Sequence, residues 1–174
     1  MLRIALFLLA LATPLRAEIN IQEVTSPGGI KAWLVEDHSI PFTALSLRFK
    51  GGTSLDRAGK RGAVNLMTGL IEEGSGKLDS QGFAAARDGL AASFHFDSDQ
   101  DGVSVSSHFL TENRDQALVL LHDALTVPRF DQDAVDRVRG QVLTGLAAAA
   151  AILAAAGPAA AYTPPGAPAA RRWF

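Results

Sequence analysis

The 174-residue chain contains no cysteine. Without cysteine it forms no disulfide, so a hydrophobic core has to hold the fold together. A lipoprotein anchor is excluded too, because that lipid is attached through a cysteine. The length suffices for one domain with a core of its own.

An excess of charge of either sign is also missing. The chain has 16 Lys and Arg against 18 Asp and Glu, a formal net charge of -2. The first 17 residues hold Arg3 and Arg16, so their removal leaves 14 basic against 18 acidic residues. A balance of this kind disfavours a nucleic-acid partner.

The N-terminus has the composition of a secretory signal. A basic start at Arg3 precedes nine apolar residues, 4–12, and Ala17 offers a small residue for cleavage. The alternative, a membrane anchor, is disfavoured because nine helical residues span about 14 Å, half of a bilayer core. We therefore expect a signal peptide over residues 1–17 and export, to a bacterial periplasm.

Strands and helices are predicted in groups rather than in strict alternation. Period-two alternation predicts strands, and apolar residues at helical spacing predict helices. The expected strands cover residues 19–24, 30–35, 42–49, 93–97 and 103–109, and the expected helices cover 61–73, 81–90, 112–125 and a stretch from 132 onward. This order favours an α+β fold, an antiparallel or mixed sheet with helices packed on one face.

The C-terminal part changes composition abruptly. No charged residue occurs between Arg139 and Arg171, and 14 of the 24 residues from 147 to 170 are alanine. Residues 18–146 are therefore expected to form the domain, followed by a low-complexity tail, 147–174, that extends the last helix to about residue 156 without forming a core layer. A truncated or frame-shifted end and a disordered tail both explain this composition. A membrane span is disfavoured because the apolar run before Gly157 is short and rich in alanine.

The four histidines do not form a motif. A helical zinc site needs two ligands on one helix face, and His38, His95, His108 and His122 have no histidine partner three or four residues away. His95 and His108 could face each other across a hairpin, but a third ligand is not evident. No metal site is predicted from the spacing.

Residues 97–102, DSDQDG, match the first half of a calcium loop. The glutamate that should close such a loop is replaced by His108, and a strand-like alternation follows. A hairpin turn at Asp101-Gly102 is the favoured interpretation.

Several segments, taken in order, resemble the pitrilysin/insulinase (M16) family of zinc peptidases. The similarity covers roughly residues 20–145 and is carried by these segments: 49–56 (FKGGTSLD), 59–62 (GKRG), 90–93 (LAAS), 128–131 (PRFD), 135–139 (VDRVR) and 142–143 (VL). The resemblance implies the N-terminal domain of such a peptidase. Family subunits usually carry two such domains, so this chain looks truncated.

The resemblance also implies where the catalytic residues of the family would stand. The zinc motif H-x-x-E-H would begin three residues after Gly62, and Asn65, Thr68 and Gly69 occupy its positions. A third ligand, a glutamate, would fall at about Thr144 and Gly145. None of these residues supplies an imidazole or a carboxylate. We therefore expect no catalytic residue, no metal and no cofactor in this chain, with zinc only in an active partner.

Residues 71–76 (IEEGSG) look like those of non-catalytic relatives, in which an inactive subunit pairs with an active one. The first hypothesis is therefore an exported, non-catalytic subunit that assists an active peptidase partner in binding and cleaving peptides. A stand-alone binding or scaffold domain and a non-functional truncated fragment are the alternatives.

Overall fold

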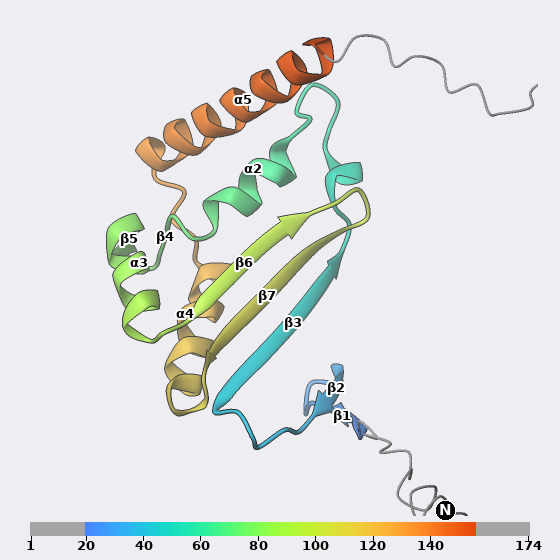
Figure 1. Cartoon of the computed structure of the whole chain (residues 1–174), viewed down its shortest axis with the longest axis vertical. Coiled ribbons are helices and arrows are strands. Elements are labelled where there is room, and N and C mark those ends of the chain that lie inside the picture. Colours follow the sequence, from blue (N-terminus) through green and yellow to red (C-terminus); the bar gives the residue numbers. More distant parts are fainter. Residues whose placement is uncertain (1–19, 156–174) are drawn as a thin grey trace, which may run out of the picture. The chain divides into compact units, whose positions relative to one another are not determined.

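The computed structural model describes residues 20–155 (Figure 1). Two compact units make up the chain, and the boundary between them lies between Pro41 and Phe42.

The first unit is a β-hairpin. Strand β1 (Ile21–Thr25) pairs antiparallel with β2 (Lys31–Val35). Ser26 closes the turn, since its Oγ accepts a hydrogen bond of 3.0 Å from the backbone N–H of Ile30. Gly29 lies in the turn at φ +84°, a left-handed conformation that favours glycine. The two strands predicted over residues 19–24 and 30–35 are confirmed, and they pair as a hairpin.

The second unit is built on a three-stranded antiparallel sheet. Its strands lie in the order β3 (Phe42–Lys50), β7 (Gly102–Leu110), β6 (Ser93–Ser98) (Figure 1). Val105 stands in the middle strand, opposite Leu47 on one side and Phe96 on the other. The three predicted strands therefore pair with one another.

In the described part of this unit, up to Ala155, four α-helices and several short elements accompany the sheet. The helices are α2 (Ala63–Leu70), α3 (Ser80–Gly89), α4 (Arg114–Thr126) and α5 (Gln132–Ala155), the 3-10 turns are η1 (Thr53–Leu55) and η2 (Thr111–Asn113), and a small ladder joins β4 (Gly74–Ser75) to β5 (Leu78–Asp79). The first predicted helix was too long: α2 ends at Leu70, because the chain turns there into the β4–β5 ladder. Asp79 caps α3, since its carboxylate accepts a hydrogen bond of 2.8 Å from the N–H of Gly82.

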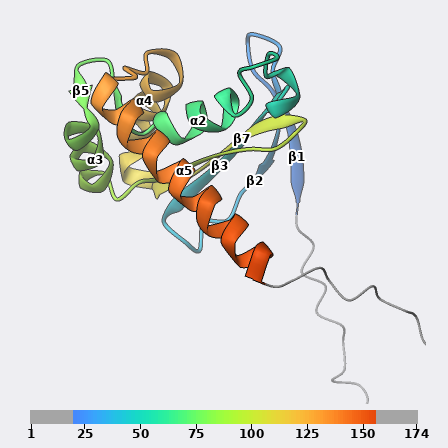
Figure 2. The ribbon, with the colours of Figure 1, turned by 90° about the horizontal axis from the view of Figure 1, so that it is seen from above.

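The main core lies between one face of the sheet and the helices. Its largest fully buried apolar side chains are Phe83 on α3 and Phe109 and Val105 on β7. They pack with Ile71, Ala92, Phe94, Ala117, Leu120, Leu121 and Ala124. Figure 2 shows α2 and α4 on the same side of the sheet. The predicted α+β fold, with helices packed on one face, is confirmed.

A second, smaller cluster joins α5 to α2. Leu70, Ala134 and Val138 are buried in it, and Leu66, Val135 and Val142 are packed against them. This packing fixes the N-terminal half of α5 over the C-terminal turn of α2.

The tip of the β6–β7 hairpin is joined to the loop before α2 by main-chain hydrogen bonds. Gly51 N donates to Asp101 O at 2.7 Å, and Thr53 N donates to Asp99 O at 2.9 Å. Gly52 lies so close to the tip that an added Cβ would overlap the carbonyl oxygen of Asp99. The predicted turn is confirmed.

The carboxylate of Asp99 is fully used within this turn. One oxygen accepts hydrogen bonds from the N–H groups of Asp101 and Gly102, at 2.8 and 2.9 Å, and the other accepts one of 2.8 Å from Arg48. The bond from Arg48, ahead of those from the backbone, lowers the pKa of Asp99. Local turn chemistry therefore accounts for Asp99 within the segment that resembles a calcium loop.

Helix α5 continues through the alanine-rich segment to Ala155, as predicted. It is long and apolar enough to cross a membrane, judged by length and composition alone. The expectation that the apolar run is too short for a span was therefore wrong. The run is part of a longer helix, Gln132–Ala155, of 24 residues. The other calls on the tail, and the signal peptide, lie outside the described residues.

Candidate functional site

Helix α2 stands where the resemblance places the catalytic helix, and a loop carboxylate fixes its start. Asp56 accepts hydrogen bonds from the N–H groups of Gly62, at 2.6 Å, and Val64, at 3.0 Å. These donors have no partner within the helix, so Asp56 caps α2 from six residues before it. Gly62 adopts φ +92° at this entry, a left-handed conformation suited to glycine.

The three positions of the zinc motif differ in their surroundings. Asn65 is exposed. Thr68 is 6% exposed, and its hydroxyl donates a hydrogen bond of 2.8 Å to the carbonyl oxygen of Asn65. Gly69 faces α5, because a Cβ built there would lie 3.2 Å from Cγ1 of Val138.

These residues do not fit a zinc ion. Zinc in proteins is held by imidazole, thiolate or carboxylate groups, and an amide, a hydroxyl bound to its own helix and a glycine offer none of them. Thr144, near the position of the implied third ligand, donates its hydroxyl to the carbonyl oxygen of Gly140 at 2.8 Å. Within residues 20–155, no three His, Cys, Asp or Glu side chains are grouped so that they could hold a metal ion.

The histidines considered from the sequence are not brought together. His95 stands opposite Ser106, and His108 stands opposite Ser93, so the two rings are offset by two residues rather than facing. The suggested cross-strand pair is therefore wrong in register. His122 is exposed and lies 3.3 Å from the carboxylate of Asp123.

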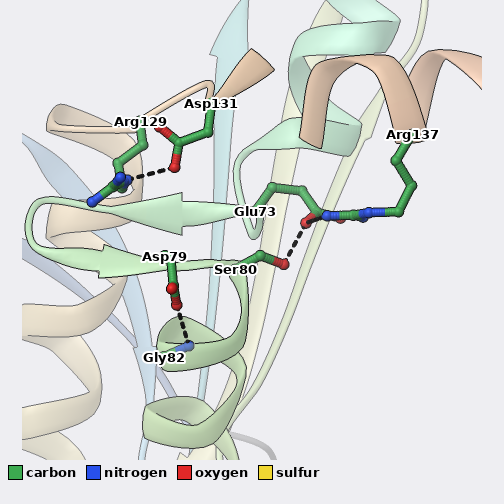
Figure 3. Close-up of polar contacts among 7 residues, drawn as sticks. All are labelled: Glu73, Asp79, Ser80, Gly82, Arg129, Asp131 and Arg137. Atoms are coloured by element: carbon green, nitrogen blue, oxygen red, sulfur yellow. Dashed lines mark hydrogen bonds and ion pairs between the residues drawn. The ribbon is translucent and has the colours of Figure 1, made fainter. Parts of the chain in front are cut away.

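A polar junction links α2, α3 and α5, and Glu73 is at its centre (Figure 3). Arg137 on α5 donates one hydrogen bond to each carboxylate oxygen of Glu73, at 2.9 and 2.8 Å. The hydroxyl of Ser80, at the start of α3, donates a third of 2.6 Å. The bonds from Arg137, more than the one from Ser80, lower the pKa of Glu73 against the opposing effect of burial. The same contact raises the pKa of Arg137.

The turn before α5 is hydrogen-bonded to strand β4, next to this junction. The N–H of Arg129 donates to the carbonyl oxygen of Gly74 at 3.1 Å, and Ser75 forms an isolated β-bridge with Pro128. The carboxylate of Asp131, one residue before α5, accepts a hydrogen bond of 2.7 Å from Nε of Arg129 (Figure 3). The main-chain carbonyl of Asp131 instead accepts the first helical bond, from Val135.

An apolar pocket of about 420 Å³ opens between α2, α4, the sheet and the turn before α5. Its lining residues are Phe49, Met67, Ile71, Val103, His122, Ala124, Leu125, Thr126, Pro128 and Phe130. Sequence reasoning missed this pocket and the Glu73 junction, since both are assembled from residues far apart in the chain. The Pro128-Arg129-Phe130 break was the one signal near both.

Comparison with known proteins decides the family. A sequence model described as Insulinase (Peptidase family M16) matches residues 31–157. The chain belongs to the M16 family. The M16 chain is also similar to "Non-peptidase homolog YmxG" of Helicobacter pylori (strain ATCC 700392 / 26695), with 32% identity over 111 residues. That alignment covers 64% of this chain and 26% of the Helicobacter protein.

Solved structures agree with this assignment. A crystal structure of a peptidase M16 inactive domain from Pseudomonas fluorescens superposes with a TM-score of 0.67 and 29% identity, over 73% of this chain and 31% of that one. Pitrilysin superposes with a TM-score of 0.64 over 77% of this chain and 14% of that one, and its 18% identity supports the fold alone. The M16 chain thus spans about a quarter to a third of the length of its non-peptidase and inactive relatives. The prediction of an M16 member of the non-catalytic kind is confirmed.

Proposed function

We propose that this M16 chain is a non-catalytic subunit that helps an active zinc peptidase of the same family to bind peptides for cleavage. The observation that carries the proposal is on α2. Asn65, Thr68 and Gly69 offer no metal ligand, while the fold around them is intact. A domain that keeps its fold without its catalytic groups is suited to binding or assembly rather than to hydrolysis.

The proposal includes export. The composition of residues 1–17 supports a signal peptide, and the periplasm of a bacterium is the compartment proposed. Zinc belongs to the partner in this scheme, because the residues of α2 do not fit the ion.

Copurification tests the partnership. The tagged chain, expressed in the organism that encodes it, is expected to bring down a protein with an H-x-x-E-H motif, identified by mass spectrometry. The recovered complex should cleave peptides, and replacing the motif glutamate of the partner by glutamine should abolish cleavage. Recovery of the chain alone would favour the stand-alone binding domain instead.

A second measurement addresses the chain by itself. The purified chain is expected to leave a peptide library uncleaved with or without added zinc. Zinc-dependent cleavage that is lost on replacing His95 or His108 by alanine would contradict a non-catalytic role.

A further inference from the structure

On the face of α2 that would hold zinc, Asn65 is exposed, but position 69 has little room for a side chain. Gly69 takes the place of the second motif histidine, and even a Cβ at this position would lie 3.2 Å from Cγ1 of Val138. Few real Cβ contacts are as close as this, so Val138 would have to move to admit any side chain at position 69.

Val138 has little freedom to move. It is 5% exposed and packs with Leu70 and Ala134. A β-branched side chain on a helix has essentially one χ1 rotamer. One residue earlier, Arg137 is held by both oxygens of Glu73, which fixes this turn of α5 along the helix axis as well.

We propose that the Gly69–Val138 crossing and the Glu73–Arg137 pair together hold α2 to α5 without a metal, and that the crossing leaves no room for a zinc-binding histidine at position 69. The loss of the ligands and the close approach of the helices are then two parts of one arrangement. Restoring the two histidines and the glutamate of the motif, together with a glutamate at position 144 as third ligand, does not restore zinc binding while Val138 is in place. This inference does not depend on the proposed partner.

Glycine-to-alanine variants give the sharpest test, because helix propensity predicts a rise in Tm and steric overlap predicts a fall. In an open helical position, this change raises Tm by about 2–4 °C for a unit of this size. Gly140 on α5 is the matched control, since a Cβ there would contact nothing within 4 Å. Gly140→Ala is expected to raise Tm, and Gly69→Ala to lower it by about 3–6 °C.

The variant Val138→Ala tests whether contact with Val138 is the reason that Gly69→Ala lowers Tm. This change alone lowers Tm because it opens a cavity. In its presence, Gly69→Ala is expected to become neutral or stabilising, so the two changes couple strongly in a double-mutant cycle. If Gly69→Ala instead raises Tm by as much as Gly140→Ala does, with Val138 intact, the proposal is overturned.

The zinc arm uses the quadruple variant Asn65→His, Thr68→Glu, Gly69→His, Thr144→Glu with Val138 unchanged, so that both histidines, the base and the third ligand are restored. The variant is dialysed against zinc chloride and then against buffer, and bound metal is measured by elemental analysis. We expect no stoichiometric zinc and no rise in Tm on adding zinc. One tightly bound zinc per chain would overturn the proposal. If the quadruple variant does not fold, the alanine cycle decides.

Discussion

Glu73 and Arg137 are 64 residues apart in the chain and meet through two parallel hydrogen bonds. Paired geometry of this kind is stronger than a single ionic contact. The Glu73 side chain is only 18% exposed, whereas that of Arg137 is 44% exposed. The pair therefore stands at the edge of the interior, where solvent screens it less than a surface pair.

Glu73→Gln is expected to lower the free energy of unfolding by about 1–2 kcal/mol, because it leaves the Arg137 guanidinium without its charged acceptor. Urea denaturation followed by circular dichroism measures the change. Arg114→Gln is the matched control: its ion pair with Asp115 is largely exposed, and its loss should stay within about 0.5 kcal/mol. Equal losses of unfolding free energy in the two variants would contradict a larger contribution from the Glu73–Arg137 pair than from an exposed ion pair.

Acid should weaken the same contact. The pKa of Glu73 is lowered in the folded chain from its ordinary value of 4.5, so the contribution of this carboxylate is complete above that value. It is lost as the pH falls below that value and through the lowered pKa of the folded state, because the unfolded chain takes up the proton first. Unfolding curves from about pH 7 down to about pH 3 should show this loss in the wild type and a shallower decline in Glu73→Gln. If stability falls equally with pH in both proteins, Glu73 does not contribute to the loss of stability in acid.

The ring of Phe83 anchors the main core. It is fully buried and stands 6.3 Å from the ring of Phe94, centroid to centroid. Phe83→Leu removes volume and an aromatic contact, and we expect a loss of about 1–3 kcal/mol. Val119→Ala on the exposed side of α4 is the control and should change stability by less than about 0.5 kcal/mol. A neutral Phe83→Leu would mean that the core repacks around the smaller side chain.

Asp56→Ala should loosen the first turn of α2. The N–H groups of Gly62 and Val64 lose their acceptor, at a cost of about 1–2 kcal/mol. Amide hydrogen exchange should therefore speed up in α2 and stay unchanged in α3. Asp79→Ala is the reciprocal control. The Asp79 carboxylate caps α3, so its loss should speed up amide exchange in α3 alone. Faster exchange in both helices after either substitution would indicate general destabilisation.

Much of the fold could be predicted because its signals are local. Asp79 caps α3 three residues away, and the Asp99 turn is closed by residues two and three positions later. The end of α2 was misplaced because the β4–β5 ladder that follows Leu70 has only two residues in each strand, too few to show an alternating pattern in the sequence. The contact of Glu73 with Arg137, 64 residues away, could not be predicted from local propensity either.

The candidate site was likewise predictable from the sequence only in part. The identity of Asn65, Thr68 and Gly69 follows from the order of motifs along the chain. Their surroundings do not, since the approach of Val138 to Gly69 depends on how two helices cross. The offset of His95 and His108 was equally invisible, because the strand register is set by the whole hydrophobic face of the sheet.

The loop around Gly52 is held to the β6–β7 tip by main-chain hydrogen bonds. Backbone atoms alone join this loop to the β6–β7 tip, so exchanging the side chains of Gln100 or Asp101 should leave the approach to α2 in place. A side chain at position 52 would instead overlap main-chain atoms of Asp99 and Gly102, so the two segments would have to move apart. The close approach of this loop to the hairpin tip therefore requires a residue that has no Cβ.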